Sequence, residues 1–321
     1  MKSGFVSIVG RTNVGKSTMC NALLHKKMSI TSSKTQTTRT EIRGVLTSDL
    51  GQAVFVDTPG IHKPKRKVGT VTNRTAFESV HDSDLILFVV DQRKGITAGD
   101  KKVYETVAKS NKPIILAINK VDKTPKEEIA KTLEVASQLF DCIDYIPISA
   151  KNLTNLKELS EVIFKHLPEG PKYYDDSSDV LVTIKQYVEE VVREKYLWFM
   201  HEEIPHSIMV QVTSQDEETI PMLPRFVGDL KLMRDLVKNA DESSAIKSIP
   251  KILHFDAKIF VERDSQKGIV IGAQGEAIKR VGTQAREELE ELLGIKVFLK
   301  TKVFVEKDWQ SNEDLINSYL K

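Results

Sequence analysis

Short apolar runs alternate with amphipathic stretches along the first half of the chain. The runs have the length of strands and are bounded by turn residues, and they cover Phe5–Val9, Val54–Val56, Leu85–Val90, Ile114–Ile118 and Ile143–Ile148. Strands of this kind, separated by helical patterns, are typical of βαβ units, in which helices cover both faces of a mostly parallel sheet. The pattern therefore predicts an α/β domain over residues 1–168.

The pattern changes after Pro168, where prolines, a glycine and acidic residues predict a linker over 169–183. An α+β domain is predicted over 184–321, with an insertion at about 216–250 that has the pattern of one more packing helix. The expected elements of this domain are a helix over Ile184–Met200, strands at Ile208–Val212, Ala257–Val261 and Lys296–Val305, and a helix that ends before Gly294.

Composition narrows the class of protein. The length of 321 residues fits two domains, and the net charge of +2 does not mark a binder of nucleic acid or membranes. Cys20 and Cys142 are too few and too far apart for a disulfide framework or a zinc site. The first residues lack the long apolar stretch of a secretory signal, and the apolar runs are too short to span a membrane. We therefore expect a cytoplasmic protein.

Residues 10–17, GRTNVGKS, directly follow the first strand and open a helical pattern. They fit the P-loop pattern G-x-x-x-x-G-K-[ST], in which backbone amides and Lys16 face the phosphates and Ser17 binds Mg²⁺. A chance match in a plain turn is the competing interpretation, and the flanking strand and helix argue against it. The residues expected to bind the nucleotide here are Gly10, Arg11, Thr12, Asn13, Val14, Gly15, Lys16, Ser17 and Thr18.

A second segment, Asp57-Thr58-Pro59-Gly60, follows the strand at Val54–Val56. The carboxylate of Asp57 is expected to face Mg²⁺ through water, and the amide of Gly60 to face the γ-phosphate. The next residue, Ile61, stands where Ras-type enzymes have a glutamine that orients water. Hydrolysis must therefore depend on other groups. The expected nucleotide-binding residues of this segment are Asp57, Thr58, Pro59, Gly60 and Ile61.

The base is expected to be guanine. Asp122 ends the segment Asn119-Lys120-Val121-Asp122, and its carboxylate can accept the two adjacent donors of guanine, whereas adenine would leave it unpaired. Each segment alone could be a surface loop, but four in order at the carboxyl ends of strands favour a domain that binds GTP and GDP. A P-loop kinase that uses ATP is the disfavoured alternative. The expected base-binding residues are Asn119, Lys120, Asp122, Ser149, Ala150 and Lys151.

These segments together resemble the Era family of translation-factor-related GTPases. The resemblance lies in GRTNVGKST, in SITSSKTQTTRTEIRGV at residues 29–45 and in DTPGIHKP at residues 57–64. It implies that Thr38 is the switch residue that reaches Mg²⁺, with Thr37 as the alternative, and that Asn13 holds K⁺ beside the phosphates. Asn13 could instead only support the turn. The implied catalytic residues are Asn13, Lys16, Thr38 and Gly60, and the implied Mg²⁺ site is Ser17, Thr38 and Asp57.

The second domain has two glycines, Gly272 and Gly275, between helical segments, an arrangement in which a nucleic-acid backbone can approach closely. The stretch VERDSQKGIVIGAQGEAIKRVGTQAREELE resembles the RNA-binding KH domain of Era proteins, although a lysine is usual in the loop, where this chain has Ala273 and Gln274. Lys267 and Arg286 are further basic residues near it. The implied RNA-binding residues are Gly272, Ala273, Gln274, Gly275, Lys279 and Arg280.

The resemblance implies a GTPase that binds the 3′ end of small-subunit ribosomal RNA and assists assembly of the small ribosomal subunit. It also implies peripheral association with the inner membrane, and we expect a monomer. The alternative is a GTP-dependent switch whose second domain binds a protein partner.

Overall fold

The computed structural model describes residues 1–32, 34, 37–64, 66–175, 180–200, 204–214 and 252–320. The chain forms two compact units, Met1–Asp176 and Ser177–Lys321. Their boundary falls within the predicted linker at 169–183, whereas the predicted insertion at about 216–250 lies outside the described residues.

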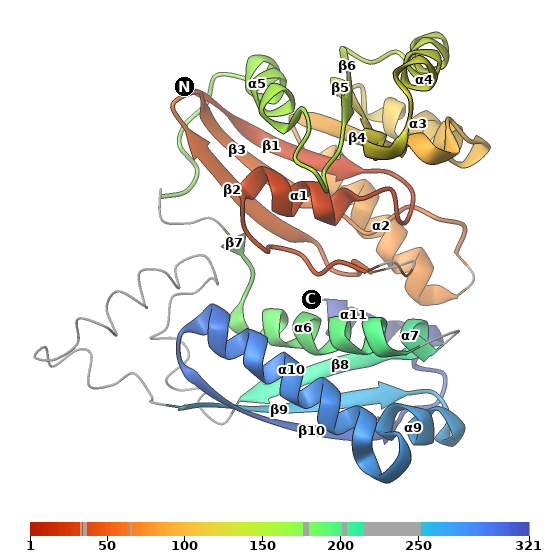
Figure 1. Ribbon diagram of the computed structural model, residues 1–321, viewed down its shortest axis with the longest axis vertical. Helices are drawn as coiled ribbons and strands as arrows, with labels where there is room; N and C mark the ends of the chain where they lie inside the picture. The colour runs from red at the N-terminus through yellow and green to blue at the C-terminus, as the bar shows by residue number, and fades with distance from the viewer. Residues whose placement is uncertain are drawn as a thin grey trace, which may run out of the picture. The chain divides into compact units, whose positions relative to one another are not determined.

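The first unit is a sheet with helices on both faces (Figure 1). Its strands are β1 (Lys2–Val9), β2 (Ile42–Ser48), β3 (Gly51–Asp57), β4 (Leu85–Asp91), β5 (Ile114–Asn119) and β6 (Asp144–Ile148). Its helices are α1 (Lys16–Leu24), α2 (Lys67–His81), α3 (Ala98–Val107), α4 (Lys126–Leu139) and α5 (Leu156–His166). Within this unit the strands lie in the order β6-β5-β4-β1-β3-β2. The mostly parallel α/β fold predicted from the apolar runs is confirmed.

One strand of this sheet was not predicted. β2 runs antiparallel to β3 in a hairpin, and it contains no long apolar run because Arg43 and Gly44 separate Ile42 from Val45 and Leu46, and Thr47 follows them. Helices cover both faces of the sheet at its other strands. α1 and α5 lie in front of the sheet in Figure 1, while α2, α3 and α4 bury Ala76, Val103 and Ala136 in the core on the other face.

Parallel pairing brings the ends of five strands, β1, β3, β4, β5 and β6, to one edge of the sheet. Ile8 pairs with Asp57, Asp91 pairs with Asn119, and Asn119 pairs with Ile148. Because parallel strands share a direction, the segments that follow β1, β3, β5 and β6 all leave the sheet at this edge. This is the place where open α/β sheets bind ligands.

Part of the predicted linker is fixed to the first unit. The backbone N–H of Gly170 donates to the carbonyl of Met1 at 3.0 Å, and buried Gln52 accepts the N–H groups of Tyr173 and Tyr174 at 2.8 and 3.0 Å. The ring of Tyr173 also packs on Phe5 with a centroid distance of 5.0 Å. These bonds place residues 170–174 in the unit that ends at Asp176.

The second unit combines helices with a three-stranded sheet of order β10-β9-β8. β9 and β10 are parallel, and β8 runs antiparallel to β9. In Figure 1, α6 and α10 lie on one side of this sheet. The elements are β7 (Val180–Leu181), α6 (Ile184–Phe199), α7 (Ile204–Ser207), β8 (Met209–Ser214), β9 (Ile252–Val261), α9 (Asp264–Ile271), α10 (Glu276–Leu293), β10 (Lys296–Val305) and α11 (Glu313–Leu320).

The second unit has its own core. Thr183 and Gln186 form a capping box at the start of α6, which buries Val188 and Val192 completely. At the carboxyl end of the chain, the buried indole of Trp309 donates to the carbonyl of Ser207 at 2.9 Å, and α11 adds Ile316 to the interior. The α+β class predicted for this region is confirmed.

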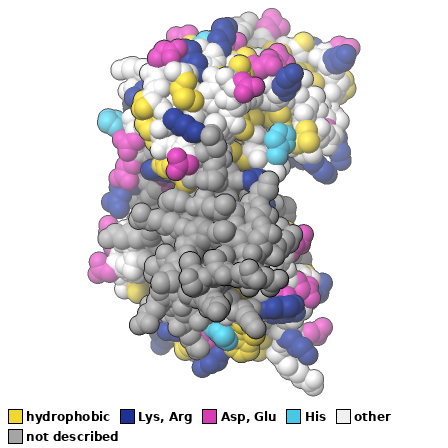
Figure 2. All heavy atoms as spheres, turned by 90° about the vertical axis from the view of Figure 1, so that its left-hand side faces the viewer, with side chains coloured by type: hydrophobic (Ala, Val, Ile, Leu, Met, Phe, Trp, Pro, Cys, Tyr) yellow, Lys and Arg dark blue, Asp and Glu magenta, His cyan; other side chains and the backbone are white. Residues whose placement is uncertain are grey.

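The charges on the surface and the apolar character of the helices fit what the composition predicts. Figure 2 shows basic and acidic side chains interspersed over the face of the first unit that is turned to the viewer, consistent with the small net charge of +2. Among the described residues, no helix is both long enough and apolar enough to cross a membrane.

Candidate functional site

The P-loop curls around the side chain of Lys16 at the start of α1. The ammonium donates to the carbonyls of Gly10 and Arg11 at 3.3 and 3.1 Å, and Lys16 is only 6% exposed. Gly15 precedes the helix with a φ of 102°, a left-handed conformation that favours glycine. Burial lowers the pKa of Lys16 to about 8, although the nearby Asp57 carboxylate acts in the opposite direction. A phosphate anion bound in this loop would supply the negative countercharge that stabilises the buried ammonium of Lys16.

The residues predicted to bind Mg²⁺ lie together. The Ser17 hydroxyl donates to Oδ2 of Asp57 at 2.7 Å and lies 2.8 Å from the Thr38 hydroxyl. The Asp57 side chain is fully buried, and its Oδ1 has no hydrogen-bond partner among the described residues. Burial raises the pKa of Asp57, while Lys16 and the hydroxyls oppose that rise. Two hydroxyls and a carboxylate with an unused oxygen are a donor set that suits a hard cation.

Thr37 and Thr38 have different surroundings. Thr38 is 7% exposed and lies within 3.5 Å of Asp57, whereas the Thr37 hydroxyl donates to the carbonyl of Lys34 at 2.8 Å. Thr38 therefore contacts both Ser17 and Asp57. These contacts fit the predicted switch role of Thr38, which stays a prediction.

The segment after β3 approaches the P-loop through its backbone. A Cβ on Gly60 would lie 2.8 Å from Cα of Thr12, so this contact has no space for a side chain. The N–H of Ile61 donates to the carbonyl of Gly10 at 3.1 Å, while the Ile61 side chain packs in the hydrophobic core. Thr58 is buried, with its hydroxyl bonded to the carbonyl of Ile8 at 2.7 Å. Pro59 lines a small neighbouring pocket.

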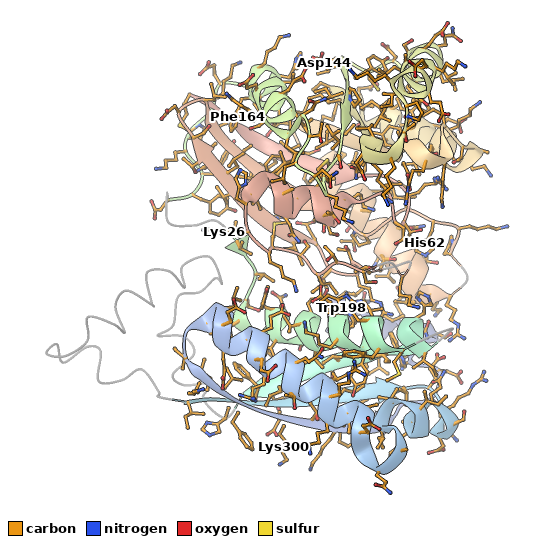
Figure 3. The ribbon with its side chains drawn as sticks, in the orientation of Figure 1. Lys26, His62, Asp144, Phe164, Trp198 and Lys300 are labelled. Carbon is orange, nitrogen blue, oxygen red and sulfur yellow. The ribbon has the colours of Figure 1, made fainter. Side chains whose placement is uncertain are left out.

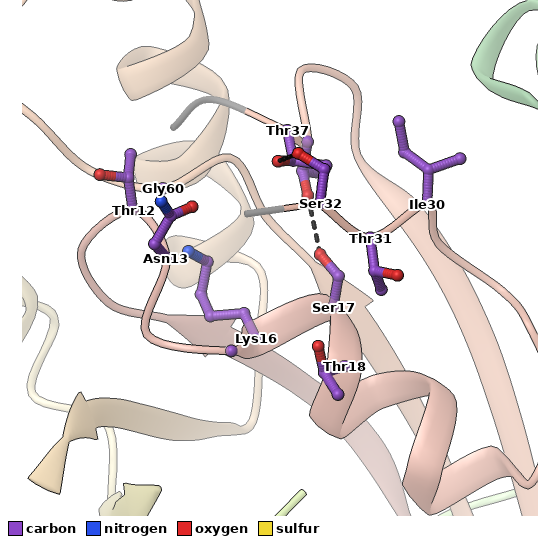
Figure 4. Close-up of a pocket in the computed structure, with 12 residues that line it drawn as sticks. Thr12, Asn13, Lys16, Ser17, Thr18, Ile30, Thr31, Ser32, Thr37 and Gly60 are labelled. Atoms are coloured by element: carbon purple, nitrogen blue, oxygen red, sulfur yellow. Dashed lines mark hydrogen bonds between the residues drawn. The ribbon is translucent and has the colours of Figure 1, made fainter. Parts of the chain in front are cut away.

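Asn119 joins three loops on the side of the site where the base is expected. Its amide donates to the carbonyl of Val14 at 2.9 Å, and its oxygen accepts the N–H groups of Lys120 and Ala150 at 2.8 and 3.0 Å. The Ser149 hydroxyl donates to Asp122 at 2.9 Å, which orients that carboxylate. Lys151 is exposed, and Thr18 lines the P-loop pocket on α1 (Figure 4).

The sequence analysis did not identify Asp91, at the end of β4. Its carboxylate, 3% exposed, accepts the ammonium of Lys120 at 2.8 Å and the guanidinium of Arg93 at 2.9 Å. Burial acts against ionisation, but the bonds from Arg93 and Lys120 outweigh it and lower the pKa of Asp91 to about 2. Lys120 also donates to the carbonyl of Asn13, so Asp91 positions a lysine that spans the P-loop. The only signal in the sequence was an acid at the carboxyl end of an apolar strand.

Arg11 and Asp100 form a second pair that was not predicted. The Arg11 guanidinium donates to the fully buried Asp100 carboxylate at 2.8 Å. Asp100 belongs to the capping box of α3 with Thr97. The side chain of Arg11 therefore anchors the P-loop to α3, and its backbone carbonyl faces Lys16. The Thr97-x-x-Asp100 pattern could have revealed the cap, although it could not have revealed its partner.

Asn13 has the backbone geometry of a turn residue. Its φ is +64°, in the left-handed region that asparagine tolerates. Its side chain also lines the P-loop pocket, close to Gly60 and Lys16 in Figure 4. Both the turn role and the cation role of Asn13 remain predictions.

The loop between α9 and α10 has left-handed backbone at three positions. Gly272, Gln274 and Gly275 have φ values of 76°, 51° and 79°. A Cβ on Gly272 would lie 2.7 Å from the Cβ of Ala277, whereas the nearest atom to a Cβ on Gly275 is 4.0 Å away. Gly272 is therefore required for packing of the loop, and Gly275 leaves an open approach. Ala273 and Gln274 are exposed.

The basic residues near this loop differ in their availability. Lys279 is exposed, and the guanidinium of Arg280 lies over the ring of Phe199 at 4.1 Å. Arg286 pairs with Glu290 at 3.0 Å. Lys279 and Arg280 therefore fit a phosphate contact better than Arg286 does.

Comparisons with known proteins agree with this geometry. A family model for 50S ribosome-binding GTPases matches residues 5–120, and a model for KH domains matches residues 241–310. The GTPase Era of Clostridium kluyveri is 40% identical over 319 residues, which cover 98% of each chain. The GTPase Era of Heliobacterium modesticaldum is 41% identical over 319 residues, which cover 99% of this chain and 97% of the relative.

Solved structures show the same likeness. The crystal structure of Era in complex with MgGDPNP and nucleotides 1506–1542 of 16S ribosomal RNA matches with a TM-score of 0.86 and 33% identity, over 99% of this chain and 98% of that one. A single-residue variant of Aquifex aeolicus Era, bound to GDP.AlF4⁻, matches with the same TM-score and identity over 99% of both chains. The similarity extends over both units, and it confirms the family resemblance seen in the motifs. The chain belongs to the GTPase Era family.

Proposed function

We propose that the protein hydrolyses GTP with Mg²⁺ in its first unit and binds the 3′ end of small-subunit ribosomal RNA through residues 272–280, and that it acts in assembly of the small ribosomal subunit. The observation that carries the GTPase part is the contact among Ser17, Thr38 and Asp57 beside the P-loop lysine. The RNA part is supported by the open approach at Gly275 and by the related Era structure that contains 16S ribosomal RNA.

On the phosphate side, the chain supplies charge and orientation. Lys16 and the amides of the P-loop bind the β- and γ-phosphates, and the negative charge of the bound phosphates favours the charged form of Lys16. The hydroxyls of Ser17 and Thr38, with Asp57 behind them, would hold Mg²⁺. Magnesium bound there neutralises charge that develops on the phosphate oxygens. Thr38 couples this site to the loop that carries it, so that loop responds to the state of the nucleotide.

The chain has no side chain at position 61 that could orient the attacking water. Ile61 is aliphatic and packs in the core, so it makes no polar contact at the phosphates. In this proposal the amide of Gly60 and the side chains of Asn13 and Lys16 stabilise the charge on the transferred group. Asn13 would hold K⁺ beside the phosphates, and the cation would supply a further positive charge there.

On the base side, Asp122 pairs with guanine. Ser149 holds one oxygen of the carboxylate, and Asn119 fixes the neighbouring loops, so the base meets a preorganised set of groups. The proposal places the protein in the cytoplasm, where ribosomal RNA is its partner, and takes it to be a monomer. Light scattering after size-exclusion chromatography checks the monomer.

Two substitutions in separate units test the proposal. Lys16→Ala should abolish tight GTP binding, and the exposed Lys101→Ala serves as its charge-matched control. Gly275→Asp should weaken binding of a labelled single-stranded RNA with the 3′-terminal sequence of small-subunit ribosomal RNA, because it places a carboxylate at the open approach. Each variant should retain the activity of the other unit. Near-normal GTP affinity in Lys16→Ala, or RNA affinity in Gly275→Asp equal to that of the parent, would refute the corresponding part.

A further inference from the structure

The three-stranded sheet of the second unit has one face that the helices of the described residues do not cover. α6 and α10 lie on one side of the sheet, and Figure 3 shows the side chain of Lys300 on β10 pointing to the other side. Side chains alternate between the faces of a strand, so residues at every second position share the face of Lys300. Along the two neighbouring strands this open face carries His254, Asp256, Lys258 and Phe260 on β9 and Phe298, Lys300, Lys302 and Phe304 on β10.

In the register of β9 and β10, these residues form four cross-strand pairs. In order along the strands, the pairs are His254 with Phe298, Asp256 with Lys300, Lys258 with Lys302, and Phe260 with Phe304. The rings of the first and last pairs lie 5.6 and 5.7 Å apart between centroids. Aromatic groups therefore flank a charged centre at both ends of the face.

The aromatic residues are more exposed than folding alone would favour. Phe298 is 56% exposed and Phe304 is 39% exposed, and the neighbouring Ile252 is 45% exposed. Single exposed apolar residues are common, but these three lie on two paired strands. Ile252 and Phe298 lie at one end of this face and Phe304 at the other, and exposed apolar groups on one face are typical of a binding surface.

The charges at the centre also lack compensation. Lys258 and Lys302 stand directly opposite each other, and like charges in that arrangement destabilise a sheet. Neither lysine forms an ion pair within the described part of the chain, and Lys300 reaches Asp256 only at 3.8 Å. Three lysines and one aspartate give this centre a net charge of +2. An anionic ligand would relieve the repulsion.

Flat apolar rings beside uncompensated lysines match single-stranded nucleic acid. Its bases stack on aromatic side chains and its phosphates require positive charge, whereas an acidic peptide would use the lysines and leave the rings exposed. Phe298 and Phe304 are six residues apart, which corresponds to about 20 Å along the strand at about 3.3 Å per residue. A few nucleotides of an extended strand cover that distance.

We infer that this open face is a second RNA-binding surface, on which single-stranded RNA stacks bases on Phe298 and Phe304 and places phosphates on Lys258 and Lys302. The inference rests on the proposed RNA-binding function and adds a surface distinct from the loop at residues 272–275. The loop and the face then contact different nucleotides of one RNA, so losses of affinity at the two places are separable.

The experiment uses the full chain and a fluorescent single-stranded RNA of 12 mixed pyrimidines, titrated at several salt concentrations. In the double variant Phe298→Ala and Phe304→Ala, affinity should fall about 25-fold, from about fivefold for each stacked base. The variant Phe298→Tyr and Phe304→Tyr keeps both rings and should bind like the parent. The exposed Leu139→Ala on α4 is the control for loss of an apolar side chain, with an exposed fraction of 39% in the parent.

The charged centre has its own test. Lys258→Gln with Lys302→Gln should reduce the slope of log affinity against log salt by about 1.4, from about 0.7 for each phosphate contact to a single strand. Lys101→Gln with Lys131→Gln, which removes two exposed charges from the first unit, should leave the slope unchanged. Circular dichroism and GTP hydrolysis of each variant confirm that both units are folded.

The outcomes separate this inference from the function on which it rests. If Gly275→Asp weakens RNA binding and both sheet variants bind like the parent, the open face is not an RNA surface, although the proposed function stands. If the parent binds no RNA, both fail. Parental RNA affinity in the sheet variants together with a change from dimer to monomer in light scattering would assign the face to self-association and overturn the inference.

Discussion

Asp91→Asn changes the ion pair behind the base-binding loop and removes almost no volume. The substitution replaces a carboxylate that is 3% exposed and accepts the Lys120 ammonium at 2.8 Å. Lys120 is 24% exposed and also donates to the carbonyl of Asn13. Without the charge on residue 91, Lys120 is held less firmly across the P-loop, so we expect weaker GTP binding.

The size of the effect follows from the bonds that change. A hydrogen bond to a charged group contributes about 1.5–3 kcal/mol, and asparagine keeps one oxygen that can accept from Lys120. The expected loss is therefore about 1–2 kcal/mol, which corresponds to about 5- to 30-fold in the dissociation constant if all of it appears in binding. Any part that does not appear in binding should lower the melting temperature of the nucleotide-free protein.

Displacement of a fluorescent GTP analogue measures the affinity, and scanning calorimetry measures the stability. Arg93→Gln is the matched control, because Arg93 is 54% exposed and its bond to Asp91 should contribute less than about 1 kcal/mol. A double-mutant cycle with Lys120→Gln isolates the pair. The reasoning is refuted if Asp91→Asn changes neither quantity, or if its effect is equally large when Lys120 is already replaced.

Three further predictions concern the nucleotide site. Asp122→Asn should weaken GTP binding roughly 100-fold and move the preference toward xanthine nucleotides, because one acceptor becomes a donor; a competition assay that still prefers GTP by the parental ratio would remove Asp122 from the base site. In the free protein the pKa of Lys16 is about 8, and bound phosphates should raise it, so GTP binding should take up a proton and weaken by up to about tenfold per pH unit above pH 8. Calorimetry at about pH 9, where free Lys16 is mostly neutral, in two buffers of different ionisation enthalpy measures that proton, and equal heats would contradict the prediction. Hydrolysis should be several-fold faster in potassium than in sodium salts and lose the difference in Asn13→Ala; equal rates for the parent in both salts would leave Asn13 with the turn role alone.

The elements and motifs that could be predicted are those formed by residues that are contiguous in the sequence. Ile114–Ile118 is an apolar run of strand length, and β5 covers Ile114–Asn119. β9 shows the limit, because the expected strand began at Ala257, whereas the structure begins it at Ile252. Polar His254 and Asp256 lie on the open face, so the alternation broke the apolar run. A half-exposed strand gives a weaker signal than a buried one.

Partners distant in sequence could not be predicted. The P-loop pattern placed Lys16 and Ser17, but nothing in the sequence assigns Arg11 to Asp100 or Lys120 to Asp91, because those pairs depend on which strands and helices become neighbours. The resemblance to a family supplied Thr38, which composition alone did not distinguish from Thr37. The structure adds a contact between Thr38 and Ser17, and the switch role of Thr38 stays a prediction.

The bonds of Asn119 limit which sequences this site can tolerate. Its amide donates one hydrogen bond and its oxygen accepts two, so an aspartate would place negative charge against the carbonyl of Val14, and a leucine would leave three backbone groups unpaired. The same amide nitrogen lies 2.3 Å from where a Cβ on Gly15 would stand. Any side chain at position 15 therefore displaces Asn119, although the two positions are far apart in the chain. We therefore expect functional variants of this protein to keep both Gly15 and Asn119, because a change at either position disturbs the other.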